Sequence, residues 1–417
     1  MKKFAAGEPV FHQGELRQEF FGLVEGRFAK VRFRNPPTSN DLDALFAHAE
    51  LLDIFEKPDQ VFGEIEALLQ QRQNYSVYAL EDAEAVEIPV NADNLHQSIR
   101  KFPGCGLATC ISLAVKLRDD LGDYSRLLRE EVATDGLIAG AAADYMEAVH
   151  AIAECAEEFS LDDLMDSAMA HPSCTLSERV INSSPSTAVA RNFGHEGWEK
   201  ARLARGSIAN AVMPFTPDRE GVVVFGPGSP LCKRGAFGNC LFILREGIAE
   251  VHLDGGARIE ISRPGSIIGE IAVLLNLGAN RGICHGSINR TADVVCLTQV
   301  KALVVPLDHI ETFLDARPDV LADLMLALTV RARETRRFSD EVQRRLRLKI
   351  GKLLRPFLEG HHELATRLES RKEKFGLDKI FRLTARRSRE IFERFSATLR
   401  MLGGMNEPSV AGFAVAR

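Results

Sequence analysis

The sequence lacks the features that mark several common classes of protein. No window of about 18 uncharged apolar residues occurs, which argues against a transmembrane helix. The N-terminal Met1-Lys2-Lys3-Phe4 leads into polar residues without an apolar stretch, so we expect no signal peptide and a cytoplasmic protein. The eight cysteines include no C-x-x-C pair, so neither a disulfide framework nor a metal site is predicted. No Ser/His/Asp or paired-carboxylate set is evident from spacing, so nothing supports an enzyme or a cofactor.

The composition is that of a folded protein with an uneven charge distribution. The 417 residues are 45% hydrophobic and 26% charged, which suits two or three domains. Residues 331–400 hold 21 Lys and Arg against 10 Asp and Glu, a local net charge of +11 in a chain of net charge −6. This basic tail either meets an acidic partner, such as nucleic acid, or lies on the chain's own acidic domains.

Two segments of the chain resemble each other. The motifs VFHQGE, FFGLVEG and FGEI, which begin at Val10, Phe20 and Phe62, correspond to VFGPGS, LFILREG and IGEI, which begin at Val224, Leu241 and Ile268. Further on, residues 76–89 and 293–306 align over 14 positions without a gap. Self-similarity on this scale predicts two copies of one domain.

Each copy has the pattern of a β-barrel followed by helices. Short alternating segments are separated by glycine turns, and Asp254-Gly255 predicts a hairpin. Apolar residues at helical spacing follow each copy; they are Leu107, Cys110, Ile111 and Ala114, and then Leu321, Leu324, Met325 and Leu328. We predict an α+β protein with two tandem jelly-roll barrels, flanking helices, a helical spacer and a basic helical tail. The boundaries are 1–125 for the first barrel, 126–212 for the spacer and linker, 213–335 for the second barrel and 336–417 for the tail.

Three local patterns carry further expectations. Leu42, Leu45, Phe46, Ala49 and Leu52 predict an extra helix inserted in the first copy. The serine-rich segment 173–187 is typical of a flexible linker. His361-His362 follows a glycine, which suggests a solvated break in a helix.

The second copy contains a motif suited to a phosphate and a ribose. Gly269 precedes a short apolar helix, where a residue without a side chain lets the backbone approach a ligand. The free N–H groups at the start of such a helix bind anions. Glu270 is an acceptor suited to a sugar hydroxyl, and Arg290 offers a planar fork that matches phosphate. Thr291 adds a hydroxyl beside the arginine.

With these residues the sequence resembles the cyclic-nucleotide-binding domain family over about residues 8–120 and 216–335. The family cassette reads F-G-E-[LI]-A-L-L, then a spacer and P-R-x-A, and the resemblance implies an eight-stranded jelly roll. It also implies that Glu270 takes the ribose 2′-hydroxyl, while Arg290 and the backbone of Ile271 and Ala272 take the cyclic phosphate. Thr291 would lie near the phosphate or the base. The ligand would be cyclic AMP or cyclic GMP, and the sequence does not identify which.

Both copies depart from the family pattern. In the second, Glu270 and Arg290 are 20 positions apart, and the insert 277–289 either loops out or displaces the arginine. A second insert occupies residues 230–239. The first copy keeps three cassette residues, Gly63, Glu64 and Ile65, but has Gln73 at the arginine position and Arg72 beside it. A neutral amide cannot offset a buried phosphate charge, so we predict a weak or empty first site.

Three functions remain open from the sequence. The first is a cyclic-nucleotide-responsive regulatory protein that signals through its C-terminal helices to a protein partner or through self-association. The second is a DNA-binding regulator, because residues 383–391 and 397–402 are distantly similar to a winged helix-turn-helix. The third is a ligand-free scaffold. A basic helical tail for docking or dimerisation is favoured over the DNA-binding interpretation.

Overall fold

The computed structural model describes most of the chain. It covers residues 1–33, 49–58, 60–90, 95–101, 103–159, 161–182, 221–252, 258–282, 288–374 and 376–402. The chain divides into two compact units: Met1–Leu121 with Ala190–Arg336, and Gly122–Val189 with Arg337–Arg417. The first unit contains both barrels, and the second joins the spacer to the basic tail, which the sequence alone presented as separate regions.

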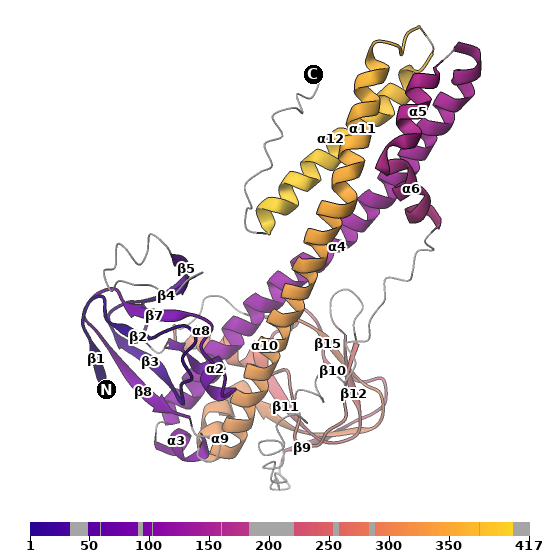
Figure 1. The fold of residues 1–417 in the computed structure, drawn as a ribbon. Helices are drawn as coiled ribbons and strands as arrows, with labels where there is room; N and C mark the ends of the chain where they lie inside the picture. Colours follow the sequence, from indigo (N-terminus) through magenta and orange to yellow (C-terminus); the bar gives the residue numbers. More distant parts are fainter. Residues whose placement is uncertain are drawn as a thin grey trace. The chain divides into compact units, whose positions relative to one another are not determined.

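The first barrel consists of two four-stranded antiparallel sheets (Figure 1). Its strands are β1 (Lys2–Phe4), β2 (Pro9–Phe11), β3 (Glu19–Glu25), β4 (Phe28–Phe33), β5 (Ala49–Phe55), β6 (Val61–Phe62), β7 (Ser76–Ala79) and β8 (Ala83–Pro89), with helix α2 (Glu64–Leu68) after β6. The sheet orders are β1-β8-β3-β6 and β2-β7-β4-β5. The core between the sheets is aromatic. The centroid of the Phe62 ring lies 5.8 Å from that of Phe21, 5.1 Å from that of Phe28 and 5.0 Å from that of Phe55.

The second barrel repeats this arrangement strand for strand. Its elements are β9 (Val222–Phe225), β10 (Pro230–Cys232), β11 (Cys240–Glu246), β12 (Ala249–His252), β13 (Arg258–Ile261), β14 (Ile267–Ile268), α8 (Glu270–Asn280), β15 (Asp293–Cys296) and β16 (Val300–Pro306). The sheet orders are β14-β11-β16-β9 and β10-β15-β12-β13, so every strand has its counterpart in the first barrel. The prediction of two tandem jelly rolls is confirmed.

Two local predictions in the barrels can be compared with the strands. Strands β12 and β13 pair as a hairpin, with His252 opposite Arg258, although the Asp254-Gly255 turn lies outside the described residues. The prediction of an extra helix in the first copy is wrong for the described residues. Ala49 and Leu52 lie on strand β5, which pairs with β4. Pairing with a neighbouring strand supplies backbone hydrogen bonds that override the local helical spacing. Leu42, Leu45 and Phe46 lie outside the described residues.

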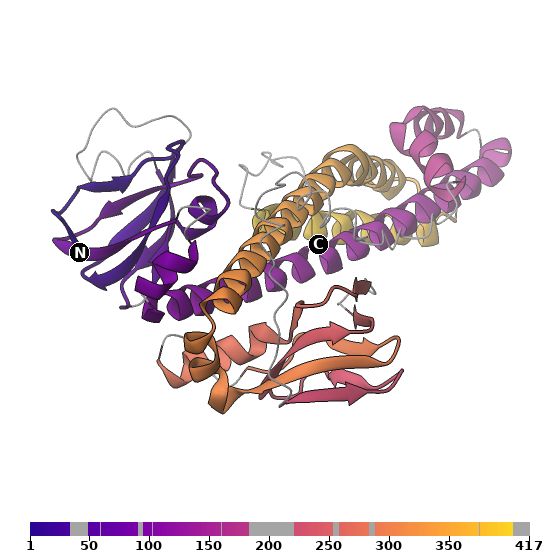
Figure 2. The same cartoon turned by 90° about the horizontal axis from the view of Figure 1, so that it is seen from below.

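A single apolar core joins the two barrels through the helices that follow them (Figure 2). These helices are α3 (Leu95–Lys101), α4 (Pro103–Phe159), the 3₁₀ turn Leu307–His309, α9 (Ile310–Ala316) and α10 (Pro318–Lys349). All eight residues of the two predicted apolar faces on α4 and α10 are buried in this core. At Gly106 a Cβ atom would lie only 2.9 Å from Leu321 Cδ2, so the absence of a side chain lets the two helices approach closely.

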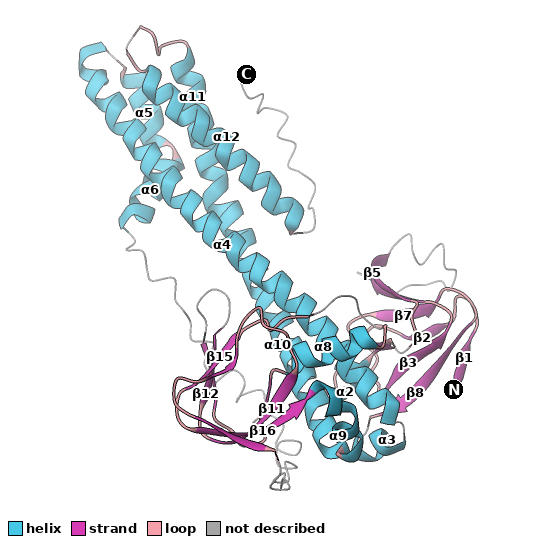
Figure 3. Cartoon of the chain, turned by 180° about the vertical axis from the view of Figure 1, so that it is seen from behind, coloured by secondary structure: helices cyan, strands magenta, loops and turns pink. Residues whose placement is uncertain are grey.

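The second unit is a helical domain (Figure 3). It contains the later part of α4, α5 (Asp162–Ala170), α6 (Pro172–Asn182), the end of α10, a π-helical segment (Ile350–Leu354), α11 (Arg355–Glu369) and α12 (Asp378–Met401). Ile138 and Ala142 of α4 share a buried cluster with Phe357 and Ile391 of the tail. The spacer and the tail are therefore held together by a common core.

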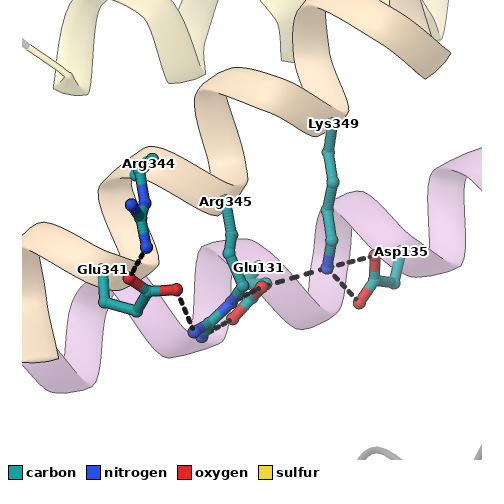
Figure 4. Close-up of polar contacts among 6 residues, drawn as sticks. All are labelled: Glu131, Asp135, Glu341, Arg344, Arg345 and Lys349. Carbon is teal, nitrogen blue, oxygen red and sulfur yellow. Dashed lines mark hydrogen bonds and ion pairs between the residues drawn. The ribbon is translucent and has the colours of Figure 1, made fainter.

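Basic residues of the tail pair with acidic residues of α4 and α5. Arg345 donates two hydrogen bonds of 2.8 Å to Glu131, and Lys349 donates one of 3.0 Å (Figure 4). Arg387 and Asp144 form an ion pair of 2.6 Å, and further ion pairs join Arg394 to Glu130 and Arg371 to Asp163. These contacts favour the interpretation in which the basic tail lies on the chain's own acidic segment.

The predicted serine-rich linker is wrong over most of its length. Residues up to Asn182 form helix α6, and residues 183–187 lie outside the described residues. Ser173 is fully buried, and its hydroxyl donates a 2.7 Å hydrogen bond to the Pro356 carbonyl. Ser173 and Ser177 are both buried in a helix interface, and the Ser173 hydroxyl satisfies a carbonyl of α11.

The distant similarity to a helix-turn-helix is also contradicted. Residues 383–391 and 397–401 lie in one uninterrupted helix, α12. Its apolar face is buried, with Ile391 and Phe395 in the domain core. This burial stabilises the helix as one continuous element across both segments. A turn between two helices is required for that motif, and α12 does not supply it.

His361 lies inside helix α11 rather than at a solvated break. The side chain is fully buried, its Nε2 lies 3.0 Å from the carbonyl of Ala141, and its ring meets the Tyr145 ring edge-on at 5.4 Å. The preceding Gly360 allows this packing, because a Cβ there would lie 2.5 Å from the Ser173 hydroxyl. Burial lowers the pKa of His361 to about 4.

We expect His361 to make the helical unit sensitive to acid. Its folded pKa is below its unfolded value of 6.5, so its stabilising effect is complete above pH 6.5 and is lost as the pH falls toward 4. Between pH 7 and pH 5 this loss amounts to about 2 kcal/mol. His361→Gln keeps a donor for Ala141 and does not titrate, so urea unfolding of this variant should lose that much less stability than wild type. His150→Gln, at an exposed position of α4, serves as control, and an equal pH dependence of His361→Gln and wild type would contradict the expectation.

Candidate functional site

The cassette of the second barrel begins with a left-handed glycine. Gly269 has φ 80° and caps α8, and the two residues that follow at the start of the helix, Glu270 and Ile271, are buried and half-buried. A Cβ at Gly269 would lie 2.3 Å from Nη1 of Arg290, so only glycine fits both the backbone angle and the neighbour. Ala272 is also buried, and the first N–H groups of this eleven-residue helix have no carbonyl partner within the helix.

Arg290 lies directly against this helix start. Its side chain donates a 2.5 Å hydrogen bond from Nη1 to the Gly269 carbonyl and another of 2.5 Å from Nη2 to the Cys240 carbonyl. The residue is 6% exposed. A guanidinium has five N–H donors, so these two contacts orient the fork and leave donors for an anion.

The two inserts of the second copy support this position of Arg290. Phe237 forms a bridge with Asn289, and the Arg290 N–H donates to the Ala236 carbonyl at 2.7 Å. Asn276 closes the other insert by accepting from the Ile288 N–H at 2.8 Å and donating to its carbonyl at 2.9 Å. The insert therefore does not displace the arginine from Gly269, and its first residues, 277–280, extend helix α8. Residues 283–287 lie outside the described residues.

Glu270 has a partner that the sequence did not indicate. The carboxylate is almost completely buried, and Oε1 forms an ion pair with Arg331 of helix α10. Burial lowers the pKa of Arg331 to about 10, which leaves the guanidinium charged at neutral pH. The pair connects residues 61 positions apart, and no local pattern could have predicted it.

The remaining predicted residue and two thiols complete this site. Thr291 is exposed, next to the buried Arg290. Cys232 and Cys240 both lie near the guanidinium, with Cys240 Sγ at 3.8 Å from Nη2. Burial raises the pKa of the Cys232 thiol to about 11 against the opposing effect of Arg290, and it raises that of Cys240 as well. Both thiols are neutral near pH 7, so neither thiol offsets the positive charge of Arg290.

The first barrel has the same geometry with a different polar group. Gly63 has φ 78°, and the amide of Gln73 donates to the Gly63 carbonyl at 3.3 Å, which is the contact that Arg290 makes in the second copy. The hydroxyl of Tyr75 accepts from the Gly63 N–H at 2.8 Å. Arg72 is exposed and donates to the Gly14 carbonyl, so it does not replace the missing cation.

Buried charges surround the first cassette. Glu64 accepts a 2.6 Å hydrogen bond from Lys116 of α4, while Glu64 Oε2, Glu66 Oε2 and Gln73 Oε1 are buried without a hydrogen-bond partner. Burial and the neighbouring Glu64 raise the pKa of Glu66. Ile65 is buried in the adjoining apolar core. Burial, together with Lys116, lowers the pKa of Lys30 to about 8. At the position where the second site has the guanidinium of Arg290, this site has the neutral amide of Gln73.

The described residues contain neither a metal-binding cluster nor a membrane-spanning helix. No group of three or more His, Cys, Asp and Glu side chains there is placed to hold a metal ion. In the same part of the chain, no helix combines the length and apolarity needed to cross a membrane.

Comparisons with known proteins agree with the repeat. Among solved structures, PfPKA-R with bound cAMP is 11% identical, with a TM-score of 0.24 over 87% of this chain and 79% of that chain. The regulatory domain of Toxoplasma gondii PKA with cAMP is 12% identical, with a TM-score of 0.21 over 77% and 83%. No curated protein sequence matches significantly. The family model of the cyclic nucleotide-binding domain matches residues 1–94 and 222–317, one match for each barrel. With both barrels matched, each barrel is a cyclic nucleotide-binding domain, and the chain carries two tandem copies of that domain.

Proposed function

We propose that this chain is a regulatory protein that responds to a cyclic mononucleotide bound in its second barrel. The observation that carries the proposal is the buried Arg290, which lies 2.5 Å from the Gly269 carbonyl at the start of α8. A buried guanidinium beside free helix N–H groups is a strong site for a single phosphate ester.

The residues of the second cassette have complementary roles in this proposal. Arg290 and the backbone N–H groups of Ile271 and Ala272 take the cyclic phosphate, whose charge they offset. Glu270 accepts from the ribose hydroxyl, because a carboxylate accepts from hydroxyls and repels phosphate. Thr291 lies near the phosphate or the base. The first barrel stays weak or empty, because Gln73 carries no charge to offset the phosphate and the exposed Arg72 donates to the Gly14 carbonyl instead.

The signal leaves the second barrel through helix α10. Arg331 of this helix pairs with Glu270 in the ligand site, so contacts of the ligand and of the helix converge on one carboxylate. Without Arg331, an unpaired buried carboxylate would face an incoming phosphate. Ligand binding therefore favours the state in which Arg331 is paired with Glu270 over the state in which it is not. Because Arg331 lies on α10, this preference couples ligand binding to the position of that helix.

Calorimetry of the full chain with cyclic AMP and with cyclic GMP tests the proposed function. We expect one nucleotide per chain, because only the second barrel has the arginine, and the preferred base is identified by the tighter of the two. Two equal sites per chain would contradict the assignment of the first barrel as weak. Absence of heat with both nucleotides, together with unchanged thermal unfolding, would favour the scaffold function instead.

A further inference from the structure

The two cassettes are each connected to the helix that follows their own barrel. In the first, Lys116 of α4 donates to Glu64 at 2.6 Å. In the second, Arg331 of α10 forms an ion pair with Glu270. Both glutamates are essentially inaccessible to solvent, so each cation neutralises a carboxylate that would otherwise be buried with an uncompensated charge. The same kind of contact thus survives in the copy that has lost its arginine.

A third ion pair connects these two helices. Arg336 of α10 donates a 2.8 Å hydrogen bond from Nε to Asp120 Oδ2 of α4. Asp120 lies one turn after Lys116, on the same face of α4, and Arg336 lies five residues after Arg331. Glu64 and Glu66 of the first cassette also act electrostatically on Arg336, and together with Asp120 they raise its pKa despite its burial.

The packing around this contact is continuous. Leu321 of α10 lies against Gly106 of α4, and the shared apolar core contains Ile111 of α4 as well as Leu328 and Ala332 of α10. The two helices are thus packed together along the segment that ends with Asp120 and Arg336. A displacement of α10 near Arg331 must either carry the Asp120–Arg336 pair with it or break it.

We propose that helix α4, which follows the first barrel, serves as an internal restraint on α10: Asp120 holds Arg336 and thereby keeps Arg331 on Glu270 in the second barrel. This inference rests on the proposed function, in that the restraint is expected to set the affinity of the second barrel for its nucleotide. It gives the first copy, through the helix that follows its barrel, a role that requires no ligand in that barrel. Asp120 and Arg336 are positioning residues for Glu270, since neither lies in the second cassette.

The test uses the full chain and a double-mutant cycle. Asp120→Asn and Arg336→Gln should each weaken binding of cyclic AMP or cyclic GMP by 3- to 10-fold, which is about 0.7 to 1.4 kcal/mol. The double variant should be no weaker than the single ones, because both changes break one contact. Asp119→Asn is the matched control: its carboxylate is 61% exposed and pairs with Arg118 on the same helix, so its affinity should equal that of wild type. Wild-type affinity in Asp120→Asn would overturn the proposal, as would additive losses in the double variant.

Hydrogen–deuterium exchange without ligand separates this proposal from the proposed function. Exchange of peptides within residues 318–336 should rise in Asp120→Asn and stay at the wild-type rate in Asp119→Asn. If wild type binds no nucleotide, the proposed function fails, and the exchange result alone decides whether the restraint exists. Unchanged exchange in Asp120→Asn rejects the restraint whether or not nucleotide binds.

Discussion

Replacing Arg290 with alanine is expected to weaken nucleotide binding to the second barrel by about 100- to 1000-fold. Loss of one partner from a buried, hydrogen-bonded charge pair costs about 3 to 4 kcal/mol, most of it from leaving the other charge without a partner. Here that other charge is the cyclic phosphate, which the neutral thiols of Cys232 and Cys240 beside Arg290 cannot offset. Isothermal titration of the full chain with its preferred cyclic nucleotide measures the change directly.

Two further variants make this result specific. Arg290→Lys keeps the charge and loses the fork that reaches both the Gly269 and the Cys240 carbonyls, so its affinity should lie between those of wild type and Arg290→Ala. Arg281→Ala removes an exposed arginine of the same barrel, one that pairs with Glu311, and should bind like wild type. Thermal unfolding of each variant verifies that the barrel is intact. Binding by a folded Arg290→Ala within threefold of wild type would refute the role of Arg290.

The barrels could be predicted from the sequence because their information is local and occurs twice. Alternating strand residues and glycine turns specify each strand, and the second copy repeats them in the same order. Gly269 was identifiable because a glycine before a short apolar helix lets the backbone approach a ligand, and the structure gives both Gly269 and Gly63 a left-handed backbone. The resemblance to the family cassette placed Arg290 and Gln73 at equivalent positions, and both side chains reach the cassette glycine carbonyl.

The partners of the cassette glutamates could not be predicted. Lys116 and Arg331 lie 52 and 61 positions from Glu64 and Glu270, on helices whose sequences signal only an apolar face. A charged residue at the edge of such a face is usually solvated, and only the packing of α4 and α10 onto the barrels makes these two cations partners of buried carboxylates.

The predictions of a linker and of a helix break in the helical unit were wrong because contacts between distant segments determine the structure there. Local composition suggested a linker at Ser173 and a break at His361, since serine and Gly-His-His are common in solvated segments. In the structure both residues are buried: Ser173 donates to the Pro356 carbonyl, and His361 contacts the Ala141 carbonyl and the Tyr145 ring. Contacts between α6 and α11, far apart in sequence, turn small and polar residues into an interface.

Replacing Glu131 with glutamine should destabilise the helical unit. It is largely buried, and it accepts hydrogen bonds from both Arg345 and Lys349 (Figure 4). Glu131→Gln removes the carboxylate that accepts both hydrogen bonds of Arg345, and it leaves Lys349 paired with Asp135 alone. Because Arg345 and Lys349 are partly solvated, we expect a loss of about 2 kcal/mol in the free energy of unfolding, below the 3 to 5 kcal/mol of a fully buried pair. Urea unfolding followed by circular dichroism measures this loss.

Asp135→Asn and pH distinguish the network from a general effect of charge. Asp135 also pairs with Lys349 but is 54% exposed, so its replacement should cost less than about 0.5 kcal/mol. Burial alone would raise the pKa of Glu131, but the hydrogen bonds from Arg345 and Lys349 outweigh burial and hold it below the usual 4.5. A depressed pKa means that the stabilisation is complete above pH 4.5 and is lost as the pH falls through the lower folded value. The difference in free energy of unfolding between wild type and Glu131→Gln should therefore be constant from pH 6 to 8 and shrink in stronger acid. Equal losses of stability for Glu131→Gln and Asp135→Asn at pH 7 would contradict this prediction, because they would show that the cations of α10 need only a nearby negative charge.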